Sequence, residues 1–159
     1  MTTFVRTVPG PVRLAVAAWL TAIGAGVAET LVRLAMPDPP TGTELAVRFA
    51  IYAGLAVLVL ALRSGRHAVR LALTVLLGGL GLLSLLGEPA AWLRDGGSIE
   101  AFLGAADTLT WAIVLVRALH VGAVLVALAA MYRPAANAYF RSGPSGRHAV
   151  DARGRAVSS

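Results

Sequence analysis

Four long apolar runs, separated by short polar segments, constrain this chain more than any other feature of its sequence. The runs extend over about residues 12–36, 45–62, 69–87 and 107–132. A helix of about 20 apolar residues can cross the hydrocarbon core of a bilayer, and each run approaches or exceeds this length. We therefore expect an all-α fold in which residues 1–141 form a four-helix transmembrane bundle.

The composition also favours a membrane protein over a soluble one. Hydrophobic residues make up 57% of the 159-residue chain and charged residues only 14%, against about 25% charged residues in an average soluble domain. A soluble helical bundle needs a polar face on each helix, but the stretch 71–87 offers only Thr74 and Ser84. The chain has no cysteine, which excludes disulfides, thiolate chemistry and cysteine-based metal sites.

The distribution of charge predicts the orientation of the bundle. With four spans, the N-terminal segment, the 63–70 loop and the C-terminal segment share one side, and they hold ten arginines but a single acid, Asp151. The loops on the other side hold five acids and one arginine, Arg94. Positively charged loops stay in the cytoplasm, so we expect a multi-pass protein of the cell membrane with cytoplasmic N- and C-termini.

The net charge of +6 comes from these arginines, and their position indicates the partner. Basic residues that flank the ends of membrane helices attract anionic lipid headgroups. A lipid bilayer is therefore the expected partner, and nucleic acid is not. The arginines expected to contact headgroups are Arg13, Arg63, Arg66, Arg70, Arg133 and Arg141.

Both ends of the chain carry further signals. Residues 142–159 are rich in Gly, Ser and Arg, so we expect them to form a disordered basic cytoplasmic tail. At the other end, a cleaved signal peptide is the alternative to a first span. Arg6 and Arg13 precede the apolar stretch Leu14–Ala28, which ends in a small-x-small pattern.

The connections between the spans contain helix-breaking residues. Three prolines in residues 37–44 predict a turn after the first span. Pro89 is expected to end the third helix, which leaves residues 88–106 as the longest loop. Within this loop Trp92 suits the membrane interface, and Ser98 is expected to cap a short helix.

Two charged residues deep inside the apolar runs need an explanation. Glu29 lies sixteen residues after Arg13, and Arg117 lies fifteen residues before Tyr132. At about 1.5 Å per residue, both lie roughly 22–24 Å from the cytoplasmic edge. Helical periodicity places Glu29 on a face of small residues that can pack closely against a neighbouring helix. We expect an intramembrane charge pair between Glu29 and Arg117, because a charge in lipid needs a partner.

Other partners for these two charges remain open at this point. Arg33 follows Glu29 at the i,i+4 spacing of an ion pair along one helix, and Arg117 could instead extend toward Asp107 or Glu100. The pair either fixes the register of two helices or forms a site for a proton, an ion or an anionic ligand. The expected polar stripe around the pair comprises Arg33, Asp107, Thr110 and His120.

The remaining polar residues form no recognisable pattern for catalysis or metal binding. His120 is not part of an H-x-x-x-H or E-x-x-H pattern, so we expect no metal and no cofactor. Asp95, Glu100 and Asp107 are interpreted as solvated loop charges, with a weak divalent-cation site as the alternative. Nothing in the sequence brings Ser84 to His120 and Asp107, so we expect no enzymatic activity.

Glycine and alanine are frequent within the spans and favour close helix packing. Gly78, Gly79 and Gly81 lie in the third span, where small residues let helix backbones approach each other. The G-G-L-G stretch lacks the pattern and the preceding strand of a nucleotide-binding loop. Gly/Ala helix faces could also support a homo-oligomer.

Two stretches resemble a known group of proteins. GRHAVRLALTVLLGG at 65–79 and YRPAANAYFR at 132–141 resemble segments of uncharacterised four-helix membrane proteins common in actinobacteria. In that group a basic entry opens the third helix, and a proline- and aromatic-containing exit follows the fourth. The resemblance covers about residues 10–141 and implies a small inner-membrane protein, with no catalytic residues to carry over.

A second resemblance concerns the first span. AGVAETLVRLAM at 25–36 is similar to the first helix of small multidrug-resistance transporters, in which a membrane glutamate takes protons and cationic drugs. In this chain, however, Arg33 and Arg117 would oppose a cation at Glu29. We therefore expect an accessory or structural membrane protein, with a small transporter or channel subunit that uses Glu29 and Arg117 as the alternative.

Overall fold

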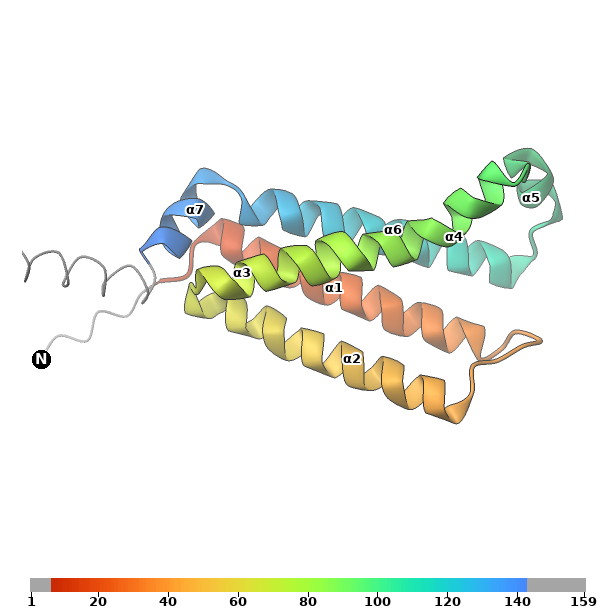
Figure 1. Ribbon diagram of the computed structural model, residues 1–159, viewed down its shortest axis with the longest axis horizontal. Coiled ribbons are helices and arrows are strands. Elements are labelled where there is room, and N and C mark those ends of the chain that lie inside the picture. The colour runs from red at the N-terminus through yellow and green to blue at the C-terminus, as the bar shows by residue number, and fades with distance from the viewer. Residues whose placement is uncertain (1–6, 143–159) are drawn as a thin grey trace, which may run out of the picture.

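The computed structural model describes residues 7–142, apart from the side chain of Glu88, and it is all-α. Four long helical segments run antiparallel to their sequence neighbours, and the first and last described residues lie at the same end of the bundle (Figure 1). The elements are α1 (Gly10–Arg33), α2 (Gly42–Ala61), η1 (Leu62–Ser64), α3 (His67–Leu73), η2 (Thr74–Gly81), α4 (Leu82–Arg94), α5 (Ile99–Ala105), α6 (Thr108–Met131) and α7 (Pro134–Arg141). The predicted disordered tail lies outside the described residues except for its first residue, Ser142.

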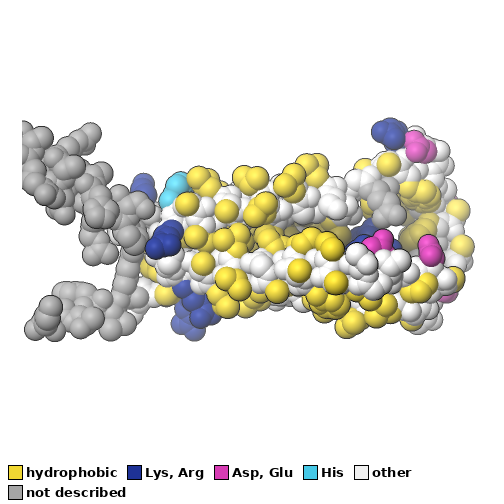
Figure 2. Space-filling view, turned by 60° about the horizontal axis from the view of Figure 1, so that its bottom comes forward, with side chains coloured by type: hydrophobic (Ala, Val, Ile, Leu, Met, Phe, Trp, Pro, Cys, Tyr) yellow, Lys and Arg dark blue, Asp and Glu magenta, His cyan; other side chains and the backbone are white. Residues whose placement is uncertain are grey.

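The expectation of four membrane-spanning helices is confirmed in its coarse form. Four helices are long and apolar enough to cross a membrane, and they extend over Gly10–Arg33, Gly42–Ser64, His67–Gly87 and Thr108–Met131. Apolar side chains cover the middle of the bundle, and charged side chains gather toward its two ends (Figure 2). This arrangement matches the hydrocarbon core and headgroup layers of a bilayer.

Helix α1 provides much of the hydrophobic core. It packs most extensively against α6, which lies beside it (Figure 1). In its most apolar stretch 50% of the residues are buried, against 11% in the span Gly42–Ser64. Its buried face contains Trp19 together with small residues such as Ala22 and Gly26. The segment that the signal-peptide alternative would remove therefore supplies much of the described core.

Helices α1 and α2 contact each other at a glycine. The Tyr52 hydroxyl of α2 donates to the Gly26 carbonyl at 3.1 Å and lies 3.2 Å from the Thr30 hydroxyl. A Cβ atom at Gly26 would lie only 3.2 Å from the Tyr52 ring. The absence of a side chain at Gly26 therefore permits this approach, as small residues do between membrane helices.

The third span differs from the expectation in two ways. Pro89 does not end the helix, because α4 continues through it to Arg94. A proline removes one backbone hydrogen bond and favours a kink, and the ribbon turns away from its neighbours along α4 (Figure 1). The centre of the span, Thr74–Gly81, is a π-helix, and a Cβ at Gly78 would lie 3.0 Å from Leu128 of α6.

The expected loop at 88–106 is mostly helical. After a turn at Asp95–Gly97 the chain forms α5, and the Ser98 hydroxyl accepts from the Ala101 N–H at 3.3 Å, as expected of an N-cap.

The start of α2 is earlier than the apolar run indicates. Thr41 and Glu44 form a reciprocal capping box there, which draws Gly42 into the helix.

A matched pair of glycines tests the contact between α1 and α2. Gly26→Val should lower the free energy of unfolding in detergent by about 1–3 kcal/mol relative to Gly24→Val, because the added methyl groups collide with Tyr52. A Cβ at Gly24 meets nothing within 4 Å, so Gly24→Val controls for helix propensity. Equal melting temperatures for the two variants would contradict this close approach.

Candidate functional site

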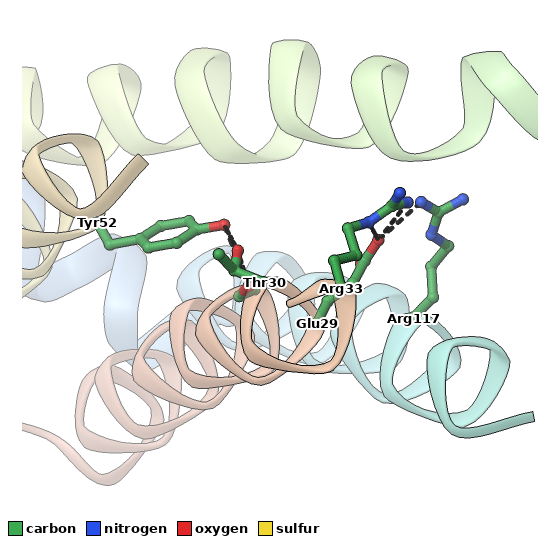
Figure 3. A network of polar contacts seen from close by, with 6 residues as sticks. Glu29, Thr30, Arg33, Tyr52 and Arg117 are labelled. Carbon is green, nitrogen blue, oxygen red and sulfur yellow. Dashed lines mark hydrogen bonds and ion pairs between the residues drawn. The ribbon is translucent and has the colours of Figure 1, made fainter. Parts of the chain in front are cut away.

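Three charged side chains meet near one end of the bundle (Figure 3). Glu29 lies in the last two turns of α1, Arg33 ends the same helix, and Arg117 comes from the first half of α6. The Glu29 Oε1 atom accepts from the Arg117 Nη2 atom at 2.8 Å. The same oxygen accepts from the Arg33 Nη2 atom at 3.1 Å and from its Nε atom at 3.3 Å. We refer to these three residues as the charge cluster.

The charge cluster is largely shielded within the protein. The exposed fraction of the side chain is 12% for Glu29, 21% for Arg117 and 33% for Arg33. Charges removed from water are stabilised only when they are paired and hydrogen-bonded, and each guanidinium supplies charge-assisted hydrogen bonds to the carboxylate. The contact between Glu29 and Arg117 links α1 to α6, so the cluster can fix the relative depth of these helices.

The two pairings that the sequence left open both occur. Glu29 contacts Arg117 on another helix and Arg33 on its own helix through one oxygen atom. Helical periodicity was sufficient to place Glu29 on the packed face of α1. It could not decide between two cations, because both are within reach of the same carboxylate.

The rest of the expected polar stripe is divided along α6. Asp107 caps the helix, and its carboxylate accepts from the Thr110 N–H at 2.8 Å. These hydrogen bonds from Thr110 hold the pKa of Asp107 below its usual range. His120 lies one turn beyond Arg117 and is partly buried, and its Nδ1 atom has no hydrogen-bond partner among the described residues. Asp107 and Thr110 therefore form the N-terminal cap of α6 and are not part of the charge cluster.

The arginines expected at lipid headgroups fall into two groups. Arg70 is only 5% exposed, and its guanidinium lies 4.0 Å from the centre of the Tyr132 ring and 5.3 Å from that of Phe140. These cation–π contacts pack the C-terminal end of α6 and α7 against α3, and the expectation that Arg70 contacts lipid headgroups is wrong because the side chain is buried. The Tyr139 hydroxyl adds a hydrogen bond to the Arg63 carbonyl. The other expected headgroup arginines, namely Arg13, Arg63, Arg66, Arg133 and Arg141, are exposed.

A cavity of about 910 Å³ adjoins the charge cluster. Arg33 and Arg117 form part of its wall, and most of the remaining wall is apolar and comes from α4, α5 and α6. The rings of Trp92 and Phe102 meet edge to face at 5.8 Å in this wall. A Cβ at Gly97 would lie 2.3 Å from the Trp92 ring, so glycine at this position lets the indole fold over the turn.

Comparison with family models, curated proteins and solved structures found no match to this chain. Within the described part of the chain, no three His, Cys, Asp or Glu residues gather in a way that could hold a metal ion. The charge cluster and the adjoining cavity are therefore the candidate functional features.

A double-mutant cycle measures the coupling between α1 and α6. Glu29→Ala and Arg117→Ala should each lower the free energy of unfolding by an amount on the order of 3 kcal/mol, because each leaves an opposite charge without this contact. The double variant should be no less stable than either single variant. Urea or detergent-mixture unfolding of the purified protein provides these values.

The exposed pair Arg94–Asp95 is a matched control for this cycle. Its side chains are 77% and 70% exposed, so its coupling should not exceed about 1 kcal/mol. If Glu29 and Arg117 show additive effects like those of the control pair, the 2.8 Å contact does not stabilise the bundle.

Proposed function

We propose that this chain is a small multi-pass protein of the cytoplasmic membrane, with both termini in the cytoplasm and an accessory or structural role. The arginines near η1 and α7 support this orientation, because they share the end of the bundle at which the described chain begins and ends. The acidic residues Asp38, Asp95 and Glu100 belong to the connections at the other end. Anionic lipid headgroups are the partners proposed for the exposed arginines.

The contacts of Glu29 support the structural role. Its carboxylate contacts two guanidinium groups and links α1 to α6. A proton or cation carrier needs a carboxylate that can exchange its partner, and two adjacent arginines disfavour a cationic substrate. We therefore propose a non-enzymatic role in which the charge cluster maintains the bundle. The small-transporter alternative has one supporting observation, the cavity beside Arg33 and Arg117.

We also propose that the protein self-associates, although fewer Gly/Ala helix faces are exposed in the structure than the sequence suggests. The small-residue face of α1, which includes Ala22 and Gly26, is buried within the bundle. Gly54 of α2 has no neighbour within 4 Å of a Cβ atom, so its helix face is open for a second copy. The resemblance of residues 65–79 and 132–141 to actinobacterial four-helix membrane proteins is consistent with such a role.

The absence of cysteine makes the orientation directly testable. Single variants Ser64→Cys and Ser142→Cys should react with a membrane-impermeant maleimide only after cells are lysed, because both positions are proposed to be cytoplasmic. Asp38→Cys and Arg94→Cys should react in intact cells. All four positions are exposed in the structure, and the unmodified chain is the background control. The opposite labelling pattern would reverse the proposed orientation.

Transport measurements separate the structural role from the carrier alternative. Proteoliposomes that contain the wild-type chain should show the proton permeability of empty vesicles, measured with an enclosed pH-sensitive dye. Glu29→Gln should reduce thermal stability and leave this permeability unchanged, since it weakens the contact with Arg117. Wild-type proton flux that Glu29→Gln abolishes would instead support the transporter.

A further inference from the structure

The cavity beside the charge cluster combines a cationic part with an apolar part. Arg33 and Arg117 line it near one end of the bundle, and Val121, Gly122 and Leu125 of α6 continue its wall toward the bundle centre. The side chains of Arg33 and Arg117 extend from their helices toward the span drawn in green, and both guanidinium groups contact the Glu29 carboxylate (Figure 3). A ligand with an anionic group and a long apolar part would match both regions.

The charges in the described wall of the cavity are of one sign. The two arginines are its charged lining residues within the described part of the chain, and Thr110 adds a hydroxyl group nearby. Arginine recognises phosphate through several donors in a fixed planar arrangement. Glu29 engages the two guanidinium groups through one oxygen atom. Arg33, whose side chain is 33% exposed, presents a guanidinium group at the wall of the cavity.

The position of the cavity indicates where its occupant comes from. Much of its wall comes from α6, which is long and apolar enough to span a bilayer, so membrane lipids would lie next to it. The cluster lies inside the membrane-spanning helices, on the side of the α1–α2 turn and α5, and Arg33 at the end of α1 is its residue nearest the headgroup layer. A volume of about 910 Å³ is within the range that holds a sizeable ligand.

We infer that this cavity binds one anionic phospholipid of the surrounding bilayer. Its phosphate contacts Arg33 and Arg117, and one acyl chain lies along the apolar face of α6 at Val121, Gly122 and Leu125. Basic pockets between membrane helices bind anionic lipid headgroups by this chemistry. The site shares Arg33 and Arg117 with the charge cluster, and the inference rests on the membrane location given in the proposed function.

Lipid binding to the purified full-length chain in mild detergent tests this inference. Phosphatidylglycerol and phosphatidylethanolamine with identical acyl chains are titrated separately, and bound lipid is counted by native mass spectrometry. Phosphatidylglycerol should bind at one tight site and raise the melting temperature, because its net negative charge matches the two arginines. Equal binding of phosphatidylethanolamine, or saturation of the same site by inorganic phosphate alone, would overturn the inference.

Two variants address the two halves of the site. Arg33→Gln leaves the contact between Glu29 and Arg117 in place and should weaken phosphatidylglycerol binding about tenfold, the loss expected for one charge-assisted contact. Gly122→Leu should weaken it by a similar or larger factor by filling the apolar part. A Cβ at Gly122 meets nothing within 4 Å, so this variant should fold.

Matched controls separate the cavity from general effects of charge and size. Arg94→Gln removes an arginine at the same end of the bundle but outside the cavity wall, and Gly54→Leu enlarges an open glycine on α2. Both should bind phosphatidylglycerol like the wild type. If Gly122→Leu also binds like the wild type, the acyl chain is not in this cavity. If Arg94→Gln loses as much affinity as Arg33→Gln, the lipid recognises surface charge instead.

Discussion

The ionised carboxylate of Glu29 is the constraint on which the arrangement of α1 and α6 depends. A carboxylate removed from water requires a cation and hydrogen-bond donors, and both come from Arg117 at 2.8 Å and Arg33 at 3.1 Å. Apolar packing is not directional, and it can be satisfied by more than one arrangement of two helix faces. A fixed ion pair between two helices adds a specific register to the close packing of their small residues.

The sequence contained most of the information needed for this arrangement. Four apolar runs predicted four spans, and a period of 3.6 residues placed Glu29 on the packed face of α1. These predictions succeed because length and helical periodicity are local properties. The expected depths of Glu29 and Arg117 followed from the rise per residue, and the structure places these side chains in contact.

The errors arose where tertiary contacts override a local rule. Pro89 was expected to end a helix, but neighbouring helices can support a kinked helix beyond a proline. Arg70 was expected at headgroups, but Tyr132 and Phe140, some sixty to seventy residues later, surround it. No pattern near Arg70 could reveal those partners. The early start of α2 has a different cause, because the capping box of Thr41 and Glu44 is a local T-x-x-E pattern that lies outside the apolar run.

The π-helix in the third span determines which side chains α4 presents to the cavity. A π-helical turn uses more residues than an α-helical turn, so each such turn rotates everything that follows about the helix axis. Leu86, Pro89 and Trp92 lie after Thr74–Gly81 and line the cavity. In a regular α-helix these three side chains would lie at other angles. The π-helix at the centre of the span thus sets the angular position of these side chains, and the wall of the cavity depends on a backbone feature about one to three turns away.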